Sequence, residues 1–203
     1  MVPSAFRSIL VVIFVVLIGS STTSAQPPCD PGFVKLTQEF SAPVPGGGCC
    51  TITVVFCYQL EGTTLRIVTH TVTVPADCPL VVGPGLFNWL RKKIVYRLSQ
   101  GGILPSIPNC PGSALLTVET SVSSCYARTL SDVPDGPVNI YNPCGTSVCT
   151  KRCAVCLSTS DTDPCSDPAN EPMLQYVGCQ NIVAPCEPDT SKPDCIYNTC
   201  DSN

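Results

Sequence analysis

The stretch TITVVFCYQL, residues 51–60, decides the fold class of this 203-residue chain. It is dense in β-branched and aromatic side chains that alternate along the chain, as in a strand with one buried face. The side chains predicted to face the core are Ile52, Val54, Phe56, Tyr58 and Leu60. After a turn at 61–63, residues 64–74 share this chemistry and end at Pro75, which cannot donate to a sheet ladder. The sequence therefore predicts a β-hairpin.

Downstream of the hairpin, an amphipathic helix is predicted between Pro84 and the glycine pair at 101–102. Proline favours the first turn of a helix and glycine the position just past its end. The apolar stripe expected to pack on the sheet consists of Leu86, Phe87, Leu90, Ile94 and Leu98. Further strands are predicted at 113–130 and 147–158. The order strand, strand, helix, strand, strand predicts an α+β fold, in which one helix covers an antiparallel sheet of about four strands.

Sixteen cysteines indicate an exported, disulfide-built protein. Residues 1–25 fit a signal peptide, because Arg7 precedes an apolar run at 9–18 and small residues lead to a predicted cut after Ala25. That run of about ten residues is shorter than a bilayer requires, and no membrane span is expected in the mature chain. The disulfide candidates are Cys29, Cys49, Cys50, Cys57, Cys78, Cys110, Cys125, Cys144, Cys149, Cys153, Cys156, Cys165, Cys179, Cys186, Cys195 and Cys200.

The mature chain divides into a predicted α+β core at 26–158 and a region at 159–203 rich in cysteine, proline and acids. This second region is expected to be loop-rich, stapled by disulfides, and packed on or bridged to the core. Seven cysteines lie in 29–125 and nine in 144–200, so complete pairing within one chain requires at least one bridge between them. The net charge is −4, whereas binding to the phosphates of nucleic acid requires positive charge, so no nucleic-acid partner is expected.

The cysteines allow two chemical alternatives to structural bridging. Cys153 and Cys156 have the CxxC spacing of thiol-disulfide oxidoreductases, but no helix is predicted after them to lower a thiol pKa. Together with Cys144 and Cys149 they could ligate zinc, although zinc sites usually have two CxxC pairs and an oxidising compartment favours disulfides. Structural bridging is preferred, and no cofactor or metal is predicted.

Two further motifs have both a chemical and a simpler interpretation. The run from Asp161 to Asp167 holds three carboxylates, a possible weak calcium site, but it lacks the glycine and closing glutamate of an EF-hand loop. A solvated acidic turn is preferred. His70 is the sole histidine, and packing at a sheet edge is preferred to catalysis because no nucleophile motif accompanies it.

The helix offers one candidate interaction face, opposite the apolar stripe. Trp89, Lys92, Lys93 and Tyr96 share this arc, and could stack on a sugar ring, bind an anionic polymer, or take up the acidic C-terminal region. The sequence favours a secreted or cell-surface protein with a structural or adhesive role and no enzymatic activity. A secreted binding or inhibitor module for a protein or glycan is the alternative, and an extracytoplasmic oxidoreductase is the third. Self-association, a surface glycan and an extracellular protein are the partners considered, with the periplasm as a further possible location.

Overall fold

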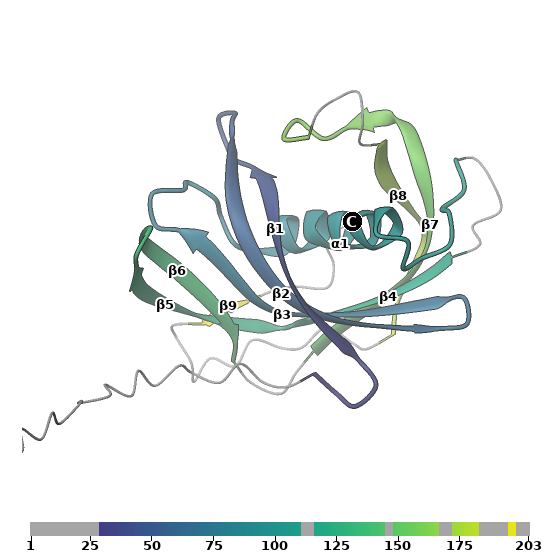
Figure 1. Cartoon of the computed structure of the whole chain (residues 1–203), viewed down its shortest axis with the longest axis horizontal. Coiled ribbons are helices and arrows are strands. Elements are labelled where there is room, and N and C mark those ends of the chain that lie inside the picture. Colours follow the sequence, from purple (N-terminus) through teal and green to yellow (C-terminus); the bar gives the residue numbers. More distant parts are fainter. Residues whose placement is uncertain (1–28, 111–115, 145–147, 167–171, 183–194, 198–203) are drawn as a thin grey trace, which may run out of the picture.

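A strongly curved sheet wraps around one long helix (Figure 1). The computed structural model describes residues 29–110, 116–144, 148–166, 172–182 and 195–197. In chain order the elements are β1 (Val34–Pro43), β2 (Cys49–Glu61), β3 (Thr64–Pro75), α1 (Pro84–Gln100), β4 (Leu116–Ser123), β5 (Cys125–Val133), β6 (Gly136–Pro143), β7 (Val148–Thr162), β8 (Pro172–Asn181) and β9 (Cys195–Tyr197). The predicted hairpin and helix are both present, and a sheet-dominated α+β fold is confirmed.

The sheet forks at β3, which gives it a mixed topology. On one side β3 pairs with β2, and β2 with β1, both antiparallel. On the other side the first half of β3 runs parallel to β4, whereas its second half pairs antiparallel with β6. From β4 the sheet continues through β7 to β8, and from β6 through β5 to β9. Beyond β3 the sheet therefore has two branches, one ending at β8 and the other at β9.

These pairings correct several expectations. The described residues form nine strands rather than about four, and the β3–β4 pair is parallel, so the sheet is not antiparallel throughout. The single strand predicted at 113–130 is two strands, β4 and β5, with a break at Ser124. The division at 158/159 stays a prediction; β7 continues to Thr162, and β8 and β9 belong to the same sheet. Strands so far apart in the chain pair through tertiary contacts that local alternation does not encode.

A β-bulge in β3 reverses which face of the strand is buried. Phe56 pairs with Thr69 and Val55 with Thr71, which leaves His70 as the inserted residue. Before the bulge the buried positions are odd-numbered; after it Thr71 is still buried, but the buried valines are the even-numbered Val72 and Val74. His70 is half-buried on this interior strand, which corrects the expected sheet-edge position.

A buried hydroxyl completes the backbone hydrogen bonding beside the bulge. The Tyr126 hydroxyl donates to the Thr69 carbonyl oxygen at 3.1 Å and accepts from the Ser123 amide at 3.4 Å. Burial raises the pKa of Tyr126, so the phenol keeps the proton that it donates.

The helix is buried around most of its circumference because the sheet curls over it (Figure 1). The five residues of the predicted apolar stripe are each at most 7 % exposed, as expected. Val95, Arg91 and Tyr96 are buried too, on arcs that a helix lying on a flat sheet would expose. Within this core the ring of Phe87 stacks on that of Tyr126, with centroids 4.7 Å apart. Among the described residues, no helix is both long and apolar enough to cross a bilayer.

Disulfides connect distant parts of the fold. The pairs are Cys29–Cys57, Cys49–Cys165, Cys50–Cys78, Cys110–Cys156, Cys125–Cys144 and Cys153–Cys179, and Cys149 is disulfide-bonded as well. The predicted bridge between the two groups of cysteines is confirmed, since three pairs join them. The candidates Cys186 and Cys200, the side chain of Cys195 and the predicted signal peptide at 1–25 lie outside the described residues.

Candidate functional site

A polar pocket of about 240 Å³ opens between β1, the outer side of α1 and the segment that follows β7. Its lining residues are Phe40, Ser41, Trp89, Lys93, Tyr96, Arg97, Cys165 and Ser166. Strand β1 contributes the first two and α1 the next four, and the Cys49–Cys165 bridge ties the last segment to the start of β2. Three segments far apart in sequence therefore build one concave site.

A buried ion pair organises the pocket rim. The Lys93 ammonium lies 2.5 Å from Oδ2 of Asp163 and donates to the Ser166 hydroxyl at 2.6 Å. The other oxygen of Asp163 accepts from the Cys165 amide at 2.9 Å. The Asp163 side chain is 0 % exposed and that of Lys93 13 % exposed, so this pair is desolvated and holds the segment after β7 against the helix.

Arg97 supplies the accessible positive charge of the pocket. It is exposed, and within the described part of the chain no ion pair joins it to a carboxylate. Because Asp163 neutralises Lys93, the charged groups described at this pocket sum to about one positive unit. A single anionic group with neighbouring hydroxyls would complement this arrangement.

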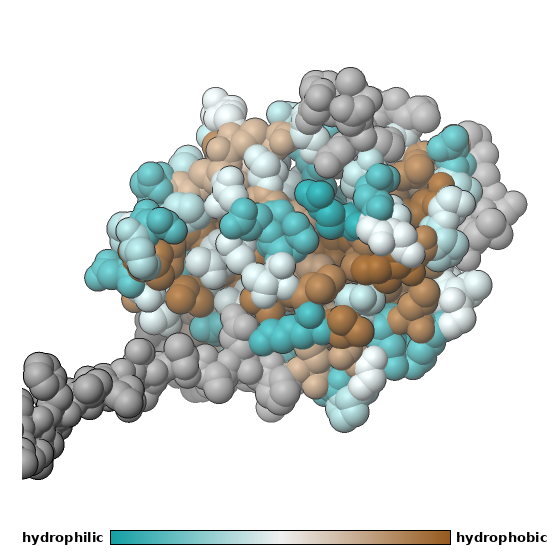
Figure 2. Space-filling model, viewed as in Figure 1, coloured by the Kyte–Doolittle hydropathy of each residue, from teal (hydrophilic) through white to brown (hydrophobic). Residues whose placement is uncertain are grey.

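Trp89 forms a wall shared by the polar pocket and a second, apolar one. The second pocket measures about 190 Å³ and is lined by Pro43, Pro45, Leu80, Val81, Gly85, Leu86 and Trp89. Phe40 meets the indole edge-on, with centroids 6.4 Å apart, and the Lys93 ammonium lies 5.9 Å from its centre. Hydrophilic and hydrophobic side chains likewise lie next to one another on the face of the molecule drawn in Figure 2.

The structure brings together three of the four residues of the candidate interaction face. Trp89, Lys93 and Tyr96 line the polar pocket, whereas Lys92 lines neither pocket. The expected outward position of Tyr96 is wrong, because the curved sheet and the segment after β7 leave it 8 % exposed. Arg97 was not singled out from the sequence, although it follows Lys93 by one helical turn and so shares its face.

The sequence around the other polar lining residues gives no indication that they belong to a binding site. Ser41 and Ser166 have unremarkable sequence surroundings and line one pocket only because the fold brings β1, α1 and the segment after β7 together. The Asp161–Asp167 run also has a role that its sequence left open. Asp163 is committed to Lys93 rather than free to coordinate calcium, while the Asp161 side chain and Asp167 lie outside the described residues.

The cysteines weighed for chemistry are held in bridges. Cys153 bonds to Cys179 and Cys156 to Cys110, so the CxxC residues are not partners of each other. Both are buried in β7, without the helix that would lower a thiol pKa. Cys144 and Cys149 are bonded too, so none of the four proposed zinc ligands presents a thiolate.

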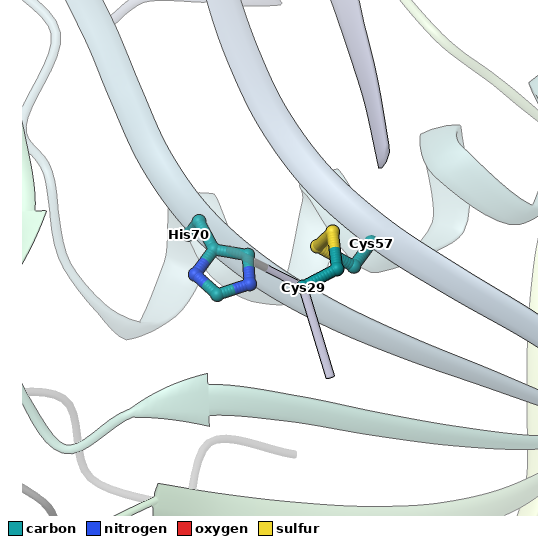
Figure 3. Close-up of side chains that lie close together, drawn as sticks. All are labelled: Cys29, Cys57 and His70. Atoms are coloured by element: carbon teal, nitrogen blue, oxygen red, sulfur yellow. A yellow bond between two sulfur atoms is a disulfide. The ribbon is translucent and has the colours of Figure 1, made fainter. Parts of the chain in front are cut away.

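A further cluster brings His70 beside the Cys29–Cys57 bridge (Figure 3). The imidazole nitrogen and the two sulfurs lie within 4.8 Å of one another, the spacing of a metal-binding group. The sulfurs are bonded to each other, however, so as arranged they are not thiolate ligands. Burial lowers the pKa of His70, nearby Lys35 lowers it further, and Asp30 acts in the opposite direction.

Comparisons with known proteins give no relative for this chain: no family model, no curated protein and no solved structure matches it.

Proposed function

We propose that this protein is an extracellular binding module whose polar pocket takes one acidic sugar unit of a glycan. The observation that carries the proposal is the convergence of Arg97, Lys93 and Trp89 with two serine hydroxyls in one concave site. Arginine forms strong, directional hydrogen bonds to carboxylates, and serine hydroxyls suit the hydroxyl groups of a sugar.

The size of the pocket limits what it can hold. Pockets for drug-sized ligands measure roughly 300–1,000 Å³. At about 240 Å³ the polar pocket suits one ring rather than an enclosed oligomer. It opens at the surface between β1 and α1, so the rest of a glycan chain could continue into solvent.

Fluorescence provides a direct test, because Trp89 is the sole tryptophan of the chain. Titration with methyl β-D-glucuronide should change its emission saturably, and methyl β-D-glucoside, which lacks the carboxylate, should bind much more weakly. Hydrogen bonds to charged groups contribute about 1.5–3 kcal/mol, so Arg97→Ala should weaken glucuronide binding about tenfold or more.

Arg128→Ala is the matched control for net charge, since Arg128 is exposed on β5 and lines neither pocket. It should leave the glucuronide affinity within about twofold. Equal binding of glucuronide and glucoside, or equal losses in the two arginine variants, would refute the acidic-sugar site.

A structural or adhesive role is the second candidate, and a specific observation favours it. The Cys49–Cys165 bridge spans 116 residues and ties the β2 end of the sheet to the end of β7, as a protein selected for durability would require. Sedimentation over a wide concentration range is the discriminating measurement. Reversible growth into oligomers would support the structural role, and a monomer that binds glucuronide would support the module. The buried, separately bridged CxxC residues offer no support for an oxidoreductase.

A further inference from the structure

The apolar pocket beside Trp89 has the composition of a second ligand subsite. Apart from Gly85, its lining side chains are two prolines, three aliphatic residues and the indole shared with the polar pocket. Val81 is 72 % exposed here, although a side chain of this kind gains by leaving water. A ligand group that covers Val81 would therefore bind favourably.

The shared indole fixes how the two subsites are related. Trp89 lines both pockets, so a ligand seated in one lies next to the other. The polar lining ends at Ser41 on β1, and the apolar lining begins two residues later at Pro43. The two pockets are thus neighbours, with Trp89 between them.

From this adjacency we infer that the preferred ligand is an acidic sugar bearing an apolar substituent, such as an alkyl or acyl group, next to its charged ring. The carboxylate faces Arg97 in the polar pocket, and the substituent lies over Trp89 against Leu80 and Val81. This inference rests on the proposed binding function and adds the chemical class of the ligand. Charge complementarity with Arg97 orients one end of the ligand, and the shared Trp89 wall places the other end beside the apolar pocket.

A homologous series tests the inference. Methyl, butyl and hexyl β-D-glucuronide, titrated against Trp89 fluorescence, should bind with increasing affinity. Burial of each methylene contributes about fourfold in affinity, until the apolar pocket of about 190 Å³ is full. Hexyl β-D-glucoside, which keeps the chain but lacks the acid, should bind far more weakly than hexyl glucuronide.

Two valine variants locate the effect. Val81→Asn should at least halve the gain per methylene while leaving methyl glucuronide affinity unchanged, because Val81 lines the apolar pocket alone. Val133→Asn is the matched control, a 39 % exposed valine at the end of β5 that lines neither pocket. It should keep the full gain. Both side chains are exposed, so neither change should impair folding.

The outcomes separate the two proposals. If methyl glucuronide binds in an Arg97-dependent manner but chain length has no effect, the second subsite is refuted and the binding function stands. A chain-length gain that Val81→Asn leaves intact also refutes this subsite, since the chain must then contact another surface. If no glucuronide binds, or hexyl glucoside binds as tightly as hexyl glucuronide, the proposed function itself is wrong.

Discussion

Lys93 links the pocket to the stability of the fold. Its ammonium group is surrounded by the Asp163 carboxylate, the Ser166 hydroxyl and the Trp89 ring. Removing one member of a buried ion pair leaves the other charged and poorly solvated, which costs more than the intact pair contributes. The Lys93–Asp163 ion pair therefore holds the segment after β7 against α1. Arg97 remains the charged group that a ligand can reach.

We expect Asp163→Asn to lower the free energy of unfolding by about 3 kcal/mol, the low end for breaking a buried ion pair, because Lys93 stays charged with 13 % of its side chain exposed. Urea unfolding with the disulfides intact measures the change. The Arg66–Glu61 pair is the control, since its side chains are 42 % and 48 % exposed. Glu61→Gln should cost less than about 1 kcal/mol. Equal losses of unfolding free energy in the two variants would contradict a stabilising role for the Lys93–Asp163 pair.

His70 makes stability depend on pH in a predictable direction. Its pKa in the folded protein lies below the ordinary value of 6.5, first because of burial and then because of Lys35. The unfolded chain consequently binds a proton more readily than the folded one, so stability should fall as the pH drops through about 6.5 toward the lower folded pKa. Urea midpoints between pH 7.5 and 5.5 should show this decline, and His70→Gln should flatten it. A wild-type curve that is level or rises toward pH 5.5 would be inconsistent with the lowered pKa.

At the scale of elements, α1 is a core helix rather than a cover lying on one face. Its predicted stripe was correct because the spacing of apolar residues alone sets which side of a helix buries. The burial of Arg91 and Tyr96 was not predictable from that spacing, since it depends on how far the sheet curls. The β3 bulge is comparable, because the apolar residues of 65–74 change from odd to even positions, but only the pairing with β2 places the inserted residue at His70.

Leu90→Ala should therefore be strongly destabilising, since Leu90 is 0 % exposed at the centre of α1. A buried leucine replaced by alanine typically costs about 3–4 kcal/mol, from lost burial and the cavity left behind. Leu130→Ala, at a residue 62 % exposed on β5, should change stability by less than about 0.5 kcal/mol. Thermal unfolding of both variants gives the comparison, and a small loss at Leu90 would show that α1 is not central to the core.

For the molecule as a whole, the Cys49–Cys165 bridge both closes the largest loop and fixes one wall of the polar pocket. Loop-closure entropy assigns about 5 kcal/mol to a bridge of 116 residues' separation and about 3.5 kcal/mol to the 28 residues between Cys29 and Cys57. The two bridges therefore differ by little more than 1 kcal/mol in stability, but only one touches the pocket.

Replacing both cysteines of each bridge by serine separates stability from binding. The Cys49/Cys165 double variant should lose stability and weaken methyl glucuronide binding several-fold, because the rim at 163–166 loses its covalent anchor. The Cys29/Cys57 double variant should lose stability alone. Denaturant unfolding and Trp89 fluorescence titration measure the two effects. Unchanged glucuronide affinity in the first variant would show that the ion pair suffices to hold the rim.

The sequence by itself determined the hairpin, the helix with its buried stripe, and the presence of disulfides between the early and late cysteines, because periodicity, proline and glycine positions and residue counts are local or arithmetic signals. The sequence also predicted that Trp89, Lys93 and Tyr96 share one face of the helix. Tertiary structure alone decided the fork at β3, the curl around α1 and the pairing of each cysteine, since these depend on contacts between segments far apart in the chain. The pocket belongs to that second group: Ser41, Arg97 and Ser166 meet only once the sheet has curled around the helix.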